Sequence, residues 1–309
     1  MNKSFSIALL ILITSCGGTP EITADMLDGD VLFDPSLYNP NQYLVSYANP
    51  TPDALQAQTP VLIVTHGYTA TTFEWDEFRN WNNANGNQFL LSQVLLGGHG
   101  RTYEEFKNST WQDWKEPILE EYERLVAAGY QNISFAGSST GGALLMEIVD
   151  SGYFKAKLAP KNIFLIDPIV IPSSKILSVV GIVGPMLGYV ESGNTPEEEP
   201  FWYHFRPQET LQELMSVITV VRKSLEEGIT LPVGCQMKVY KSTSDPSADP
   251  ASAVLIYKGI KKPDGSVIDI EMIDSQLHVF TRLALRSSVS QKDTNNQNLV
   301  FQDMKNRLF

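Results

Sequence analysis

Short apolar runs alternate with amphipathic helical patterns along the chain from about residue 42 onward. Several of these runs are continuous and rich in β-branched residues, as is typical of strands that are buried on both faces of a sheet. The alternation predicts an α/β fold with a mostly parallel, doubly wound sheet. The predicted strands are 43–47, 61–65, 93–96, 133–136, 163–166, 237–241 and 267–272.

One helix is well defined by its sequence. The segment 111–128 places large apolar residues at steps of three and four, which predicts a helix with one buried face. Thr110 and Asp113 have the spacing of a capping pair at its start. Gly129 is placed to end it.

The alternation breaks between Asp167 and Met237, where we find no clear strand pattern. This insert, at about 173–233, holds an apolar stretch at 176–190 and an amphipathic helix at 208–227. It is either a helical hairpin that covers the sheet or a lid over a pocket. Long insertions in α/β folds tend to follow the C-terminal ends of strands, where ligands bind, so we favour the lid. Trp202 and Phe205 are our candidates for pocket walls, with packing of the lid onto the core as the alternative.

The N-terminus carries a separate pattern. Lys3 precedes an apolar run at 5–13, and small residues follow up to Cys16. As a helix, this run would span about 13 Å, short of a hydrocarbon core of roughly 30 Å, which favours a cleaved signal peptide at 1–15. The residues around Cys16 resemble a bacterial lipoprotein box, which implies a lipidated Cys16 anchored in the cell envelope. The polar segment 16–40 then forms a flexible tether. An ordinary signal peptide with an incidental cysteine is the alternative.

Composition excludes several classes of protein. Hydrophobic residues make up 43% and charged residues 19% of the chain, values that fit neither a disordered protein nor a polytopic membrane protein. The net charge of −12, without any large cluster of Lys and Arg, argues against nucleic-acid binding. The two cysteines, Cys16 and Cys235, cannot form a disulfide framework, and we expect Cys235 to be a small buried side chain.

The strongest chemical signal follows the predicted strand 133–136. There the sequence runs through Gly137, Ser138, Ser139, Thr140 and Gly141 into a helical pattern. This is the motif G-x-S-x-G, a strand-to-helix turn so tight that small residues must flank the central serine, whose hydroxyl it exposes. The motif alone is weak evidence for a catalytic serine, so the prediction depends mainly on the strand before it and the helix after it. Ser139 is the predicted nucleophile.

A serine nucleophile needs a general base, and the chain has four histidines. In this type of turn the chain order is serine, acid, histidine, which excludes His66 and His99. His204 lies in the insert. His278 follows the last predicted strand, where a loop could bring its imidazole onto Ser139, and it is the predicted base.

The acid should follow a strand between the serine and the histidine. Asp245 lies just beyond the predicted strand 237–241 and is favoured, with Asp249 as a near rival and Asp167 as a more distant one. Acyl transfer also needs backbone NH donors for an oxyanion. The NH of Thr140 follows the nucleophile, and that of Tyr68 lies in the loop after the strand 61–65.

The ordered set of motifs resembles the α/β-hydrolases, and within them the carboxylesterase and monoacylglycerol lipase group. The matching residues are His66, Gly67 and Tyr68; Gly98, His99 and Gly100; 111–114; the turn around Ser139; Asp245 with Asp249 and Pro250; and His278. The resemblance covers about residues 40–290. It implies a helical cap over an acyl pocket, a structural His99, and no metal or organic cofactor. The strand before the acid ends in Ser242 and Thr243 instead of the more usual glycine, so Asp249 remains an alternative to Asp245 as the acid.

The sequence therefore predicts a hydrolase domain at 41–309 that cleaves short or medium acyl esters, monoacylglycerols included. Its expected partners are a small-molecule ester and the membrane that holds Cys16, and no obligate protein partner is evident. Two alternatives remain. The chain is a catalytically inactive binding or assembly lipoprotein, or it is an amidase or peptidase with the same triad, since both reactions proceed through an acyl-enzyme.

Overall fold

The computed structural model describes residues 48–173 and 188–309. Three features predicted above lie outside the described residues: the signal peptide 1–15, the tether 16–40 with its lipidation site at Cys16, and the strand 43–47. The apolar stretch 176–190 also lies outside them, except for residues 188–190.

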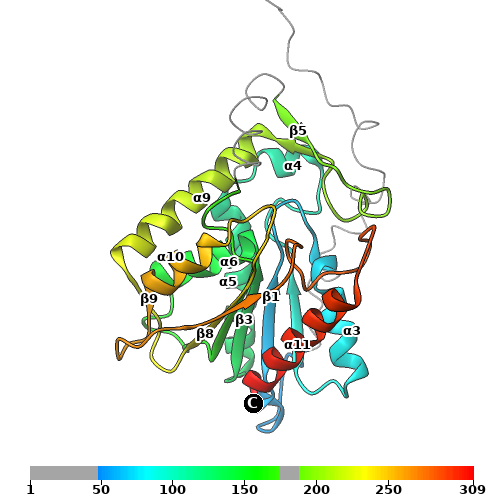
Figure 1. The fold of residues 1–309 in the computed structure, drawn as a ribbon. Coiled ribbons are helices and arrows are strands. Elements are labelled where there is room, and N and C mark those ends of the chain that lie inside the picture. The colour runs from blue at the N-terminus through cyan, green and yellow to red at the C-terminus, as the bar shows by residue number, and fades with distance from the viewer. Residues whose placement is uncertain (1–47, 174–187) are drawn as a thin grey trace, which may run out of the picture.

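A six-stranded sheet forms the centre of the molecule, with strand order β10-β8-β4-β3-β1-β2 (Figure 1). Every neighbouring pair is parallel, which confirms the predicted sheet. Its strands are β1 (Val61–Thr65), β2 (Leu90–Val94), β3 (Ile133–Ser138), β4 (Asn162–Ile166), β8 (Gln236–Ser242) and β10 (Asp269–Ile273).

Two strands lie a few residues away from their predicted positions. β2 was expected at 93–96, but its pairing with β1 begins at Leu90 and ends at Val94. Leu95 and Leu96 are buried just beyond the last paired residue, so the apolar run continues after the hydrogen-bonded ladder has ended. Similarly, Val267 makes only an isolated bridge to Lys261, and β10 begins at Asp269.

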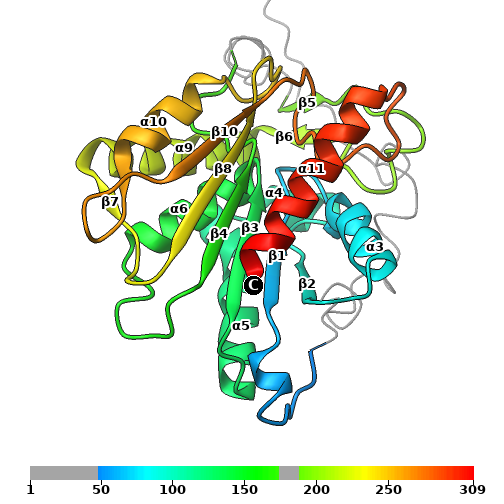
Figure 2. The same ribbon diagram turned by 60° about the horizontal axis from the view of Figure 1, so that its bottom comes forward.

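Helices cover both faces of the sheet (Figures 1 and 2). On one face lie α5 (Trp111–Ala128), α6 (Thr140–Asp150), α9 (Gln208–Glu227) and α10 (Ala251–Gly259). On the other lie α3 (Asp76–Ala84) and α11 (Gln291–Leu308). The shorter helices are η3 (Gln56–Gln58), η4 (Thr72–Trp75) and α4 (Tyr103–Lys107).

Strand β1 shows why the sheet needs both layers. Val61 and Ile63 belong to the core beneath α5, α6 and α9. Leu62 and Val64 belong to the core beneath α3 and α11. Because successive side chains of a strand point to opposite faces, a fully apolar strand is stable only where both faces are covered.

Helix α5 has the predicted bounds and the predicted ends. Thr110 and Asp113 form a capping box, in which each side chain accepts a hydrogen bond from the other's backbone NH. Gly129 ends the helix at φ 102°, a left-handed conformation that glycine adopts without strain.

The insert contains short strands that its sequence did not predict. β5 (Tyr189–Glu191) and β6 (Phe205–Pro207) form an antiparallel pair, and β7 (Ile229–Thr230) pairs with β9 (Ile260–Lys261). Strands of two or three residues are too short to show a periodic pattern. Helix α9, at its predicted bounds, buries Leu214, Val217 and Val221 in the core that it shares with α6. Within the described ranges, no helix combines the length and the apolar character that crossing a membrane requires.

Candidate active site

Ser139 occupies a strained turn between β3, which ends at Ser138, and α6, which begins at Thr140. Its backbone has φ 48° and ψ −113°, a conformation that non-glycine residues rarely adopt. The turn needs glycine on both sides. A Cβ at Gly137 would lie 2.6 Å from the carbonyl carbon of Gly141, and one at Gly141 would lie 2.8 Å from the carbonyl oxygen of His66. The motif predicted from the sequence is therefore a tight strand-to-helix turn with Ser139 at its apex.

A hydrogen-bonded chain joins Ser139 to two residues on separate loops. The Ser139 hydroxyl donates to His278 Nε2 at 2.8 Å, and His278 Nδ1 donates to Asp245 Oδ2 at 2.9 Å. His278 follows β10 and Asp245 follows β8, so three strand ends bring the three side chains together. Asp249 makes a different contact: its Oδ1 accepts from the NH of Ala251 at the start of α10, and Asp245 is the carboxylate bonded to His278.

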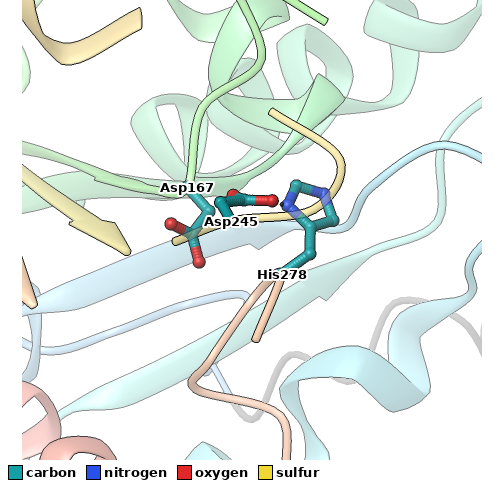
Figure 3. Close-up of side chains that lie close together, drawn as sticks. All are labelled: Asp167, Asp245 and His278. Carbon is teal, nitrogen blue, oxygen red and sulfur yellow. Dashed lines mark hydrogen bonds and ion pairs between the residues drawn. The ribbon is translucent and has the colours of Figure 1, made fainter. Parts of the chain in front are cut away.

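Asp245 is part of a buried charge cluster (Figure 3). Its carboxylate lies between Asp167 and the imidazole of His278. The ammonium of Lys241, which the figure does not draw, contacts both carboxylates. The side chains of Lys241, Asp167 and Asp245 have no solvent exposure. Asp167 also accepts from the NH of Ser242 at 2.7 Å. Two carboxyl groups and one ammonium group therefore lie together behind the histidine.

Burial and charge act in opposite directions on the two carboxyl groups. Burial disfavours the charge on Asp245, but the charges and hydrogen bonds of His278 and Lys241 outweigh it and hold the pKa of Asp245 below its ordinary value. Burial also raises the pKa of Asp167, and there Lys241 opposes the rise without cancelling it. Asp245 is therefore the ionised partner of His278.

Asp167, Asp245 and His278 could each offer one ligand atom to a metal ion, since these atoms lie within 4.8 Å of one another. The donor set does not fit that use. Lys241 already supplies a positive charge to both carboxylates, and His278 Nε2 is bonded to Ser139. A cation at this place would have to displace the lysine.

The two residues predicted to donate backbone NH groups adjoin Ser139, one in sequence and one in the loop whose Gly67 packs against it. Thr140 is the first residue of α6, where a helical NH has no acceptor within the helix. Tyr68 follows Gly67, where a Cβ would lie 3.1 Å from the Cβ of Ser139. The buried Glu74 holds this loop, because it accepts from the NH of Gly67 at 2.9 Å and from the hydroxyl of Ser138.

The other three histidines have structural partners. His66 Nδ1 donates to the carbonyl of Gly67 and its Nε2 accepts from the NH of Leu96, while burial lowers its pKa to about 4. Burial also holds the pKa of His99 well below its ordinary value. His204 pairs with Glu199 in the insert. Of the four histidines, only His278 bonds to Ser139.

A cavity of about 460 Å³ opens beside Ser139 and His278. The insert contributes part of its wall, including Trp202 and Arg206. Phe205, which we expected to be a wall, does not line this cavity; its ring packs against Tyr189 and His204. Since Phe205 and Arg206 are neighbours in strand β6, their side chains point to opposite sides. Of the two residues expected to be walls, Trp202 therefore lines the cavity, whereas Phe205 packs within the insert.

Sequence reasoning missed three residues of this region. Lys241 is a charged residue at the end of a strand that was predicted to lie inside the sheet, which was a usable signal of a buried ion pair. Arg206 stands between Phe205 and Pro207 and was hidden by the aromatic residues of the insert. Glu74 gave no signal, because an acidic residue between Phe73 and Trp75 is unremarkable by sequence.

The chain is similar to known lipolytic and esterolytic enzymes, although no family model matches it. It is 24% identical over 237 residues to a carboxylesterase of Bacillus subtilis. The aligned region covers 75% of this chain and 89% of that protein. It is 22% identical over 226 residues to a thermostable monoacylglycerol lipase of Bacillus sp. (strain H-257), covering 71% and 83%. The structure of a metagenome-derived lipolytic enzyme superposes with a TM-score of 0.63 at 19% identity, covering 81% of this chain and 94% of that one. The chain has the α/β-hydrolase fold.

Proposed function

We propose that this protein is a serine hydrolase that cleaves carboxylic esters through an acyl-enzyme on Ser139. The observation that carries the proposal is the hydrogen-bonded chain from Ser139 through His278 to Asp245. Asp245 holds the proton of His278 on Nδ1, so that Nε2 is free to accept the proton of the serine. The distant similarity to a carboxylesterase and a monoacylglycerol lipase supports an ester as the substrate.

In the first half of the reaction, His278 Nε2 takes the proton of Ser139 as the Oγ attacks the ester carbonyl carbon. The carbonyl oxygen becomes an oxyanion, and the NH groups of Tyr68 and Thr140 donate to it. Each such donor is worth about 10²–10³ in rate. When the tetrahedral intermediate collapses, the ester C–O bond breaks and His278 gives its proton to the departing alcohol. The acyl group stays on Ser139.

In the second half, His278 takes a proton from water as the water oxygen attacks the acyl carbon. The same two NH groups hold the second oxyanion. The bond to Ser139 Oγ then breaks, His278 returns the proton to the serine, and a carboxylic acid leaves. Asp245 stays ionised throughout and stabilises the positively charged imidazole.

The cavity beside Ser139 is the proposed substrate site, and the insert at about 173–233 is the proposed cap over it. Ser192, Asn194, Glu198, Trp202 and Arg206 of the insert line this cavity. Residues that line it are thus supplied both by the sheet's loops and by the insert, as expected if the insert selects substrates.

Hydrolysis of p-nitrophenyl acyl esters tests the proposal. The wild-type protein should hydrolyse short or medium acyl esters, and Ser139→Ala should lower kcat by about 10⁴-fold or more, because no other group forms the acyl-enzyme. Ser151→Ala is the matched control. Ser151 is exposed at the far end of α6 and its loss should leave activity unchanged.

A fluorophosphonate probe separates the alternatives. Labelling of the wild type but not of Ser139→Ala supports a reactive serine and argues against an inactive binding module. Equal hydrolysis by wild type and Ser139→Ala would overturn the proposal. Cleavage of p-nitroanilides at rates comparable to those of the matching esters would instead assign the triad to amide hydrolysis.

A further inference from the structure

The cavity beside Ser139 carries three arginines, although the whole chain has a net charge of −12. Two of them have partners that account for their positions. Arg282 donates to Glu198 at 2.7 Å and lies over the ring of Trp202, 4.5 Å from its centroid. Arg286 donates to the carbonyl of His278 at 2.6 Å and so supports the loop that carries the histidine.

Arg206 lacks such a partner. Its Nη2 donates to Ser192 Oγ at 3.0 Å, and its Nε is buried without a hydrogen bond. No carboxylate of the described residues forms an ion pair with it, although the side chain is partly buried. Burial lowers the pKa of Arg206, and only Tyr68 opposes that effect. Burying a charge without a counter-ion is costly, so buried guanidinium groups are normally paired.

The fold directs this unpaired charge toward the cavity. Arg206 is the central residue of β6 and pairs with Val190 of β5. The alternation of the strand turns Phe205 to the opposite side, and Arg206 lines the same cavity as Ser139. The pairing of β6 with β5 therefore fixes the backbone of Arg206, and its side chain lines the cavity in which the ester would bind.

We infer that Arg206 binds an anionic oxygen group of the substrate, such as a carboxylate, and that the preferred substrates are esters with a negative charge. This inference rests on the proposed ester hydrolysis at Ser139. A bound anion would supply the missing counter-ion and accept hydrogen bonds from the guanidinium. A neutral ester of the same shape would leave the charge unpaired in a desolvated site.

Matched pairs of esters test the inference. p-Nitrophenyl adipate carries a free carboxylate on its acyl chain, and the corresponding amide is neutral and of the same size. p-Carboxyphenyl hexanoate and p-carbamoylphenyl hexanoate place the same pair on the leaving group. For one of these pairs, wild type should prefer the anionic ester, and Arg206→Gln should reduce the ratio of kcat/KM values about ten- to one-hundredfold.

Two further variants sharpen the comparison. Arg206→Lys keeps the charge and should retain part of the preference. Arg222→Gln removes an arginine from the exposed face of α9 and should leave the ratio unchanged. If Arg206→Gln slowed both members of each pair equally, Arg206 would have a structural role or act on the transition state, and the inference would be wrong.

Binding separates this inference from the proposed function. The Ser139→Ala variant is titrated by calorimetry with the p-nitroanilide of adipic acid and with its neutral amide. Tighter binding of the acid, lost on adding Arg206→Gln, supports anion recognition even if the wild type hydrolyses no ester. Equal affinity of Ser139→Ala for the two probes, or a preference for the acid that survives Arg206→Gln, overturns it, whatever the esterase assay shows.

Discussion

At the scale of single residues, Lys241 is a charged side chain that lies fully buried behind the catalytic histidine of the proposed triad. Its ammonium is fully buried and contacts Asp167 and Asp245, and Asp245 Oδ2 accepts from both Lys241 and His278. A buried lysine normally requires such pairing, because the desolvation of an isolated ammonium is costly. Lys241 thus balances two carboxylates, of which only Asp245 contacts the histidine.

Removing this lysine should destabilise the protein in a pH-dependent way. Lys241→Met leaves the two carboxylates facing each other and should lower the free energy of unfolding by about 3–5 kcal/mol at pH 7. The pKa of Asp245 is lowered in the folded state, so its stabilising contribution is full above the ordinary aspartate pKa of about 3.9 and is lost as the pH falls through the folded value. Without Lys241, the pKa of Asp245 is lowered less in the folded state. The loss in the free energy of unfolding relative to wild type should therefore be largest at neutral pH and become smaller as the pH falls.

Denaturant unfolding at several pH values measures this deficit. The double variant Lys241→Met with Asp167→Asn is the control, because it removes one negative charge together with the positive one. It should recover much of the lost stability at pH 7. A deficit that is the same at every pH, or a double variant no better than the single one, would contradict the charge balance.

Substitution of the two candidate acids, Asp245 and Asp249, should have opposite effects on kcat. Asp245→Asn keeps the shape of the side chain but no longer holds the required tautomer of His278, and it should lower kcat about 10⁴-fold. Asp249→Asn changes a side chain that accepts from the NH of Ala251 at the start of α10, and its kcat should stay near that of wild type. Steady-state kinetics with one p-nitrophenyl ester measures both. The reverse ranking would assign the acid to Asp249.

At the scale of elements, the position of Ser139 depends on how closely α6 approaches the end of β1. Gly141 lies in the first turn of α6, against the backbone of Thr65 and His66. Gly142 is less restricted, since its Cβ would first meet Pro168 Cβ at 3.0 Å. The helix therefore reaches its place only where the side chain at residue 141 is a hydrogen atom.

Gly141→Ala should displace the start of α6 and, with it, the serine and the NH of Thr140. We expect a loss of about 1–3 kcal/mol in stability and of about 10²-fold in kcat/KM, because small displacements of reacting groups are costly. Gly142→Ala is the graded control and should have a smaller effect on both. Thermal unfolding and ester hydrolysis measure the two quantities. If Gly142→Ala were the more damaging change, the close approach to β1 would not be what positions the serine.

At the scale of the whole molecule, we propose that the chain is a lipoprotein of the bacterial cell envelope, held by lipidated Cys16. The motif that ends in Cys16 supports this, together with the scarcity of cysteine elsewhere. The only other cysteine, Cys235, is buried and unpaired, and burial raises the pKa of its thiol to about 12. Cys235 is therefore unreactive, and we expect any lipid to be carried by Cys16.

Labelling with palmitate in a bacterial host tests the anchor. Wild type should incorporate label and sediment with the membranes, whereas Cys16→Ala should remain unlabelled, because it lacks the thiol that accepts the lipid. Cys235→Ala should still be labelled. Labelled Cys16→Ala protein, or unlabelled wild type, would favour an ordinary signal peptide.

Much of the architecture follows from local sequence patterns. Apolar runs predicted the buried strands β1, β3 and β4, since a sheet covered on both faces leaves no polar face. The amphipathic helices α5 and α9 have their predicted bounds, because a 3.6-residue period over many turns is a strong signal. The glycines around Ser139 predicted its turn. Each of these features depends on residues that are neighbours in sequence.

The contacts between distant residues were decided by the tertiary structure. By sequence, Asp245 and Asp249 both follow one strand, and only the packing of three strand ends brings Asp245 to His278. Likewise, the three-residue strand β6 decides that Arg206, and not Phe205, faces the cavity. The charge balance of Lys241 joins residues from β8 and the ends of two strands. Sequence patterns report local periodicity and chain order, whereas the distance between side chains on separate loops depends on how the elements pack.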